Sequence, residues 1–173
     1  MLDVEALERL GLLALSGASN VTNDPALAAP RVLALRDASP PVAYLVAATK
    51  KAVFLLPLRE GVTLVGRGSG CEYEASRTEL AGVVEGAQWK ITCTTTHALV
   101  QDTGSTNGSV LLGRDDRDAA SSGLAALHAG SIGRRVGWDG IAQHAEAAPL
   151  ERGDVLVNAY AAFVFVAREA GDR

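Results

Sequence analysis

The 173-residue sequence has few lysines, few aromatic residues and no long apolar run, and these shortages exclude whole classes of protein. Only three of its 16 basic residues are lysines, and 20 acidic residues bring the formal charge to −4. No basic face for a phosphate backbone is expected, so we predict no nucleic-acid partner. The longest apolar runs, at 42–48 and 53–58, are far shorter than the ~20 residues that cross a bilayer, so we predict no membrane partner.

Only two cysteines are present, Cys71 and Cys93, and they lack the spacing of metal ligands. We therefore expect small buried side chains in a reducing compartment rather than a disulfide. The first residues are acidic where a secretion signal would be positive. Both observations favour a cytoplasmic protein.

No pattern in the sequence indicates catalysis. His97, His128 and His144 share neither metal-ligand nor catalytic spacing, and there is no Gly-x-Ser-x-Gly motif. The glycine-rich segment 66–70 lacks the Lys-Ser/Thr pair of a nucleotide-binding P-loop and no helical pattern follows it. We therefore predict no catalytic residue, no metal site, no cofactor and no enzymatic activity.

The spacing of apolar residues predicts a mainly β protein with a helical start. Leu2, Ala6, Leu10 and Leu13 recur at helical spacing, which predicts a short helix over 3–15, and residues 1–41 form a helix and linker arm. Short apolar runs separated by turn signals then predict strands at 42–47, 53–58, 62–65, 89–93, 98–101, 109–112, 154–158 and 162–166. Such a series is typical of an all-β sandwich or barrel over 42–168, with a tail at 169–173.

Two interstrand segments differ from ordinary connections. Residues 114–148, rich in Ala, Gly, Ser, Asp and Arg, form a long insertion, which in a compact domain is either functional or mobile. Ser105-Thr106-Asn107-Gly108 follows one predicted strand and precedes the next. Asn-Gly is the strongest short hairpin signal, so this segment is a sharp polar turn whether or not it binds a ligand.

Four motifs together resemble the forkhead-associated (FHA) domain family. They are Gly66-Arg67 at a strand end, the Trp89 strand, the Gly-Ser-Thr-Asn-Gly stretch 104–108, and Gly153-Asp154 before the last strands. The resemblance covers about 42–113 and 149–166. It implies an all-β, FHA/SMAD-like antiparallel β-sandwich of about eleven strands that binds phosphothreonine peptides through loops at one end.

The resemblance also implies roles for individual residues. Arg67 would contact the phosphate, because a guanidinium offers paired donors to phosphate oxygens. Asn107 would hold the peptide backbone, because its amide both donates and accepts. Ser105 and Thr106 would shape or line the loop, and the remaining two positions, Gly66 and Gly108, would supply backbone geometry.

The middle motif departs from the family pattern. Counted back without gaps, Glu85 occupies the position of the phosphate-binding serine and Gln88 that of the structural histidine. A carboxylate repels phosphate and donates no hydrogen bond to it. Alternatively, Ser76-Arg77 supplies the hydroxyl and a guanidinium through a shifted register, or Arg67 pairs with Glu85 internally.

These observations predict a protein-protein interaction module of altered or weakened phosphopeptide binding in Ser/Thr-kinase signalling, with a phosphorylated or unphosphorylated protein partner. The alternative is a phosphate-independent structural or scaffold protein that uses the N-terminal arm or the insertion. Because consecutive loops of an antiparallel sandwich alternate between its ends, we expect the insertion to lie at the end far from the phosphate site.

Overall fold

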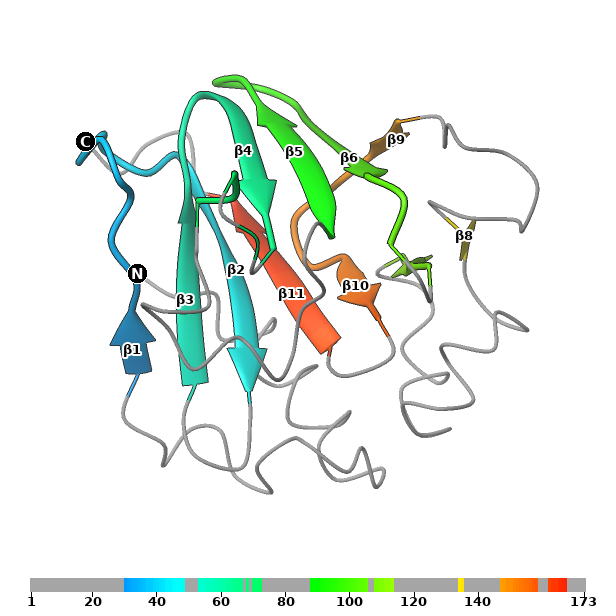
Figure 1. The fold of residues 1–173 in the computed structure, drawn as a ribbon. Coiled ribbons are helices and arrows are strands. Elements are labelled where there is room, and N and C mark those ends of the chain that lie inside the picture. The colour runs from blue at the N-terminus through cyan, green and yellow to red at the C-terminus, as the bar shows by residue number, and fades with distance from the viewer. Residues whose placement is uncertain are drawn as a thin grey trace.

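The computed structural model describes residues 30–48, 53–66, 68, 70–72, 88–105, 108–113, 134–135, 147–158 and 162–167. All regular secondary structure in these ranges is β-strand (Figure 1). The predicted helix over 3–15 lies outside the described residues. Within the described ranges, no helix has the length and apolar character needed to span a membrane.

Eleven strands are found in the described residues. They are β1 (Pro30–Val32), β2 (Ala43–Ala48), β3 (Val53–Leu58), β4 (Gly61–Val65), β5 (Trp89–Cys93), β6 (Ala98–Asp102), β7 (Val110–Leu112), β8 (Arg134–Arg135), β9 (Ala148–Pro149), β10 (Val155–Val157) and β11 (Ala162–Ala167). Every predicted apolar run overlaps one of these strands. The remaining strands, β1, β8 and β9, are only two or three residues long and carry no periodic pattern.

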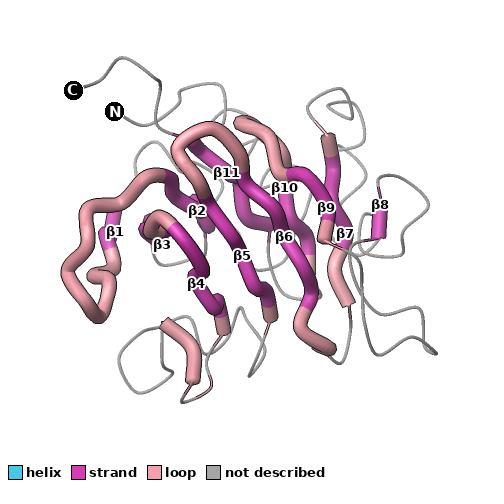
Figure 2. The backbone as a smooth tube through the Cα atoms, turned by 90° about the horizontal axis from the view of Figure 1, so that it is seen from above, coloured by secondary structure: helices cyan, strands magenta, loops and turns pink. Residues whose placement is uncertain are grey.

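The strands form two sheets, which confirms the predicted antiparallel β-sandwich. One sheet has the order β1-β3-β2-β11-β10-β7-β8 and the other β4-β5-β6-β9. Figure 2 shows β4, β5 and β6 side by side in one layer, with β2, β11 and β10 in the second layer. All pairs are antiparallel except β1 with β3, which is parallel. Residues of the predicted N-terminal arm are therefore part of the larger sheet.

The core lies between the two layers because buried and exposed residues alternate along the strands of the smaller sheet. In β5, Trp89, Ile91 and Cys93 are buried, whereas Lys90 faces solvent. This period of two follows from the pleat, which points successive side chains to opposite faces. Trp89 meets Phe163 of the other sheet edge-to-face, with ring centroids 4.9 Å apart, a geometry worth about 0.5–1.5 kcal/mol beyond burial.

Strand register brings three chain segments to one end of the sandwich. Val65 at the end of β4 is paired with Trp89, and Trp89 is paired with Asp102 at the end of β6. Gly66 and the segment after Asp102 therefore leave the smaller sheet at the same end. We call this end the loop end. At the opposite end, β3 passes into β4 through the turn that precedes Gly61.

The placement of the insertion differs in part from the sequence prediction. It leaves β7 at the far end, as expected, but β8 returns antiparallel along β7, with Arg135 opposite Val110. Val110 is the first residue of β7 and lies at the loop end. The prediction that 114–148 lies wholly at the far end is therefore wrong, because it allowed for no strand within the insertion.

Candidate functional site

The structure describes only part of the predicted site. Gly66, Gln88, Ser105 and Gly108 lie within the described residues. The other predicted site residues lie outside them: Arg67, Ser76, Arg77, Glu85, Thr106 and Asn107. The described residues fix where the segments bearing these side chains begin and end.

The two segments with the predicted ligand contacts emerge at the same end of the smaller sheet. Gly66 follows β4, Ser105 follows β6, and β5 lies between these strands. Adjacent strands are about 4.8 Å apart, so β4 and β6 are separated by about 10 Å. An extended peptide lying across this end can therefore contact both segments at once.

Asp102 anchors the segment after β6. One carboxylate oxygen, Oδ1, accepts hydrogen bonds from the backbone N–H groups of Gly104 (2.9 Å) and Ser105 (2.8 Å). The other, Oδ2, accepts from the hydroxyls of Ser105 and Ser109, both at 2.6 Å. Asp102 is only 4% exposed, so these four hydrogen bonds replace its hydration and fix the start of the turn.

Ser105 and Gly108 shape this turn from inside. Besides donating to Asp102, the Ser105 hydroxyl accepts a hydrogen bond from the Gly108 N–H at 3.1 Å. Ser105 is 3% exposed, so its hydroxyl makes these contacts inside the protein, and its role in a ligand site stays a prediction. Gly108 has a φ of 73°, a left-handed conformation that costs other residues about 1–2 kcal/mol.

Ser109 links the turn to the core. Its hydroxyl oxygen accepts hydrogen bonds from Gln88 Nε2 (3.1 Å) and from the indole Nε1–H of Trp89 (2.8 Å), while its proton goes to Asp102. A hydroxyl has one proton and two lone pairs, so the full capacity of Ser109 is used. No described buried side-chain N or O atom lacks a hydrogen-bond partner, so the network is satisfied throughout.

Gln88 joins several elements at the loop end. Its backbone N–H donates to Val65 O (3.0 Å) and its backbone oxygen accepts from Thr103 N–H (3.1 Å). Its side-chain oxygen accepts from Asn158 Nδ2 (3.3 Å), just after β10. Gln88 is completely buried, so it acts structurally. Its equivalence to the family's histidine stays a prediction.

Sequence reasoning missed several members of this network, namely Asp102 as an anchor, Ser109 and Asn158. Asp102 had a local signal, because an aspartate followed by Thr-Gly is typical of a side chain that hydrogen-bonds the backbone two residues on. Asn158 had none, because 70 residues separate it from Gln88. Only the folded sandwich brings this pair together.

No protein-family model and no curated protein matches the sequence. Solved structures do match. An FHA domain from a structural and functional study of phosphothreonine-dependent FHA interactions is 17% identical, with a TM-score of 0.45. That match covers 73% of this chain and 97% of the other.

Two further matches come from different organisms. An FHA domain of an Arabidopsis thaliana protein is 16% identical with a TM-score of 0.48, over 77% of this chain and 91% of the other. Mycobacterium tuberculosis EmbR, solved with a low-affinity phosphopeptide, is 19% identical with a TM-score of 0.46, over 80% of this chain and 28% of EmbR. The chain is thus similar to forkhead-associated domains both in its motifs and in the solved structures that it matches.

Proposed function

We propose that this chain is an FHA-like interaction module that binds phosphothreonine peptides at its loop end, with altered or weakened phosphate recognition. One observation carries the proposal. The segments that contain the Gly66-Arg67 and Ser105–Gly108 motifs leave β4 and β6 at one end, separated by a single strand. The buried network around Asp102 and Ser109 fixes one of these segments before any ligand arrives.

The proposed chemistry divides the peptide between two side chains. Arg67 supplies a planar fork of N–H donors to the phosphate, and Asn107 donates to and accepts from the peptide backbone. Ser76 and Arg77 are a second source of a hydroxyl and a guanidinium if the intervening segment adopts the shifted register. The matched EmbR was solved with a low-affinity phosphopeptide.

Glu85 is the reason for proposing altered recognition. It stands in the sequence where the family has a phosphate-binding serine. At about 4 Å, two unit charges repel each other by about 1–4 kcal/mol, depending on solvent exposure. By the relation of about 1.4 kcal/mol per tenfold, this repulsion weakens binding roughly 5- to 700-fold. A dissociation constant well above that of a serine-containing site is therefore expected.

Titration of the full chain with a fluorescent phosphothreonine peptide library tests the proposal. Arg67→Ala should weaken binding about tenfold or more, because hydrogen bonds to charged groups contribute about 1.5–3 kcal/mol. Glu85→Ser should strengthen binding, since it replaces repulsion with a donor. Arg152→Ala, an exposed arginine in the turn at the opposite end, is the matched control and should bind as wild type does.

Two outcomes would contradict the proposal. Equal binding of phosphorylated and unphosphorylated peptides would favour the phosphate-independent scaffold. Unchanged affinity in both Arg67→Ala and Glu85→Ser would show that the phosphate does not bind where the motifs indicate.

A further inference from the structure

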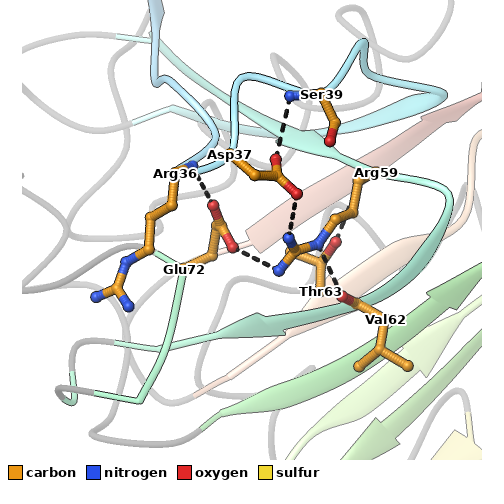
Figure 3. Close-up of polar contacts among 7 residues, drawn as sticks. All are labelled: Arg36, Asp37, Ser39, Arg59, Val62, Thr63 and Glu72. Atoms are coloured by element: carbon orange, nitrogen blue, oxygen red, sulfur yellow. Dashed lines mark hydrogen bonds and ion pairs between the residues drawn. The ribbon is translucent and has the colours of Figure 1, made fainter.

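An ion-pair cluster lies beside the open edge of β4, away from the hydrogen-bond network of the Ser105 turn. Arg59 bridges two carboxylates, with Nη1 2.6 Å from Asp37 Oδ2 and Nη2 2.8 Å from Glu72 Oε2 (Figure 3). Its Nε donates to the Val62 carbonyl oxygen at 3.0 Å. The Glu72 side chain is only 2% exposed, whereas those of Arg59 and Asp37 are 29% and 44% exposed.

Glu72 is also where the segment after β4 returns to the strand it left. Its backbone N–H donates to the Leu64 carbonyl oxygen at 2.8 Å, next to the point where the chain departs at Gly66. Cys71 N–H closes a turn onto Gly68 O at 3.0 Å. Gly66 and Glu72, the described residues at the two ends of this segment, therefore both lie beside β4.

The arm that follows β1 completes the anchorage. The Arg36 backbone N–H donates to Glu72 Oε1, so each oxygen of the carboxylate has a partner from a different segment (Figure 3). Asp37 holds Arg59 from the same arm and accepts a hydrogen bond from Ser39 N–H at 3.1 Å. Leu35, between β1 and this contact, is buried, which fixes the arm against the sandwich.

We infer that Glu72 and Arg59 are positioning residues, which let the N-terminal arm set the conformation of the 66–72 segment and thereby the presentation of Arg67 to phosphate. The inference rests on the proposed function for its ligand. Its physical basis is the burial of Glu72, whose carboxylate accepts from both Arg36 N–H and the Arg59 guanidinium. Without this carboxylate both donors lose their acceptor, and the contacts that hold the return point of the segment against the arm are lost.

Peptide titration of full-chain variants, at a temperature where all are folded, tests the inference. Glu72→Ala should weaken phosphothreonine-peptide binding at least tenfold. Glu72→Gln should bind more tightly than Glu72→Ala, because its amide oxygen still accepts from Arg36 N–H, but more weakly than wild type, because its NH₂ group faces the Arg59 donor. Asp154→Ala is the matched control. It removes another buried carboxylate, which accepts from Glu151 N–H at 2.8 Å in a turn at the opposite end, and should leave affinity within twofold of wild type.

Equal loss of affinity in Glu72→Ala and Asp154→Ala would overturn the inference, because it would show a general effect of stability. So would unchanged affinity in Glu72→Ala. Rescue by Glu72→Gln is a readout that loss of folding alone would not give.

Amide hydrogen exchange separates failure of the inference from failure of the proposed function. Exchange at residues 67–71 should be at least tenfold faster in Glu72→Ala than in wild type, and unchanged in Asp154→Ala. If wild type binds no phosphothreonine peptide, the proposed function is wrong, but faster exchange still supports the anchoring role. If exchange at 67–71 is unchanged in Glu72→Ala, the anchoring role is wrong whatever the peptide does.

Discussion

Replacing Asp102 by asparagine tests whether the buried network holds the turn that follows β6. The aspartate accepts two backbone N–H groups on Oδ1 and two hydroxyls, those of Ser105 and Ser109, on Oδ2. Asparagine has the same shape but only one accepting oxygen. With its oxygen toward the two N–H groups, its NH₂ group faces two hydroxyls that need an acceptor.

The hydroxyl of Ser109 cannot adapt to this change by rotating. Its oxygen already accepts from Gln88 and Trp89, so a third donor finds no lone pair and its own proton has nowhere to go. Each stranded buried donor costs about 1–3 kcal/mol, and there are two such hydroxyls. We therefore expect Asp102→Asn to lower the free energy of unfolding by about 2–6 kcal/mol, a large part of the about 5–15 kcal/mol typical of a domain.

Urea unfolding followed by tryptophan fluorescence measures this loss. Trp89 is a suitable probe because its indole N–H belongs to the same network. A double-mutant cycle with Ser109→Ala should give a coupling of at least about 1 kcal/mol, since the two residues are in direct contact. A change below about 0.5 kcal/mol in Asp102→Asn, as at ordinary surface positions, would refute the reasoning. If the free-energy changes of Asp102→Asn and Ser109→Ala simply add in the double variant, the loss of stability does not arise from the contact between Asp102 and Ser109.

Two further predictions concern ionisable groups. Burial raises the pKa of Cys93 to about 11 from an ordinary 9.0, so its thiolate fraction near pH 8 is about 100-fold lower. Iodoacetamide should therefore label Cys93 at least 100-fold more slowly in the native protein than in urea, as mass spectrometry can measure; equal rates would contradict its burial. Hydrogen bonds from Ser39, followed by that from Arg59, lower the pKa of Asp37 from 3.8 to about 2. Because the folded pKa is the lower one, this contribution to stability is present above about pH 4 and lost as pH falls toward 2. Asp37→Asn should be less stable than wild type at pH 6, and the difference should vanish near pH 2; a difference independent of pH would exclude the charge of Asp37 as its cause.

The strands of the sandwich could be predicted because their signal is local. In β5 and β6, buried and exposed residues alternate, and turn residues mark the strand ends. The three short strands escaped prediction for the same reason. β8 has only two residues, and it pairs with β7, which lies more than 20 residues earlier in the chain. A local pattern of apolar residues cannot indicate such a pairing. The prediction that the whole insertion lies at the far end was wrong because it did not include β8.

The position of two described residues of the candidate site, Ser105 and Gly108, could be predicted from the sequence, whereas the hydrogen bonds that hold their turn could not. Ser105 and Gly108 stand in a recognisable turn signature, so their place in the loop followed from the sequence. The partners that hold the turn come from distant strands: Asn158 reaches Gln88, and Gln88 reaches Ser109. The contact of Glu72 with Arg36 likewise spans 36 residues. Such pairs are selected by the register of the sheets, and register is a property of the whole sandwich.

The Ser105 turn and the 66–72 segment are held by different kinds of contact, and this difference bears on peptide affinity. The described residues of the Ser105 turn are held by groups that are buried and fully hydrogen-bonded, so these residues require little further ordering when a peptide binds. The 66–72 segment depends instead on Arg59 and Asp37, which are partly exposed and therefore contribute less. We therefore expect substitutions that strengthen peptide binding to be those near the proposed phosphate contact and not those in the Ser105 turn. Glu85→Ser removes the charge that we predict to lie next to the phosphate, so it should raise affinity more than any substitution that stiffens the Ser105 turn. The opposite ranking would show that loop order limits binding.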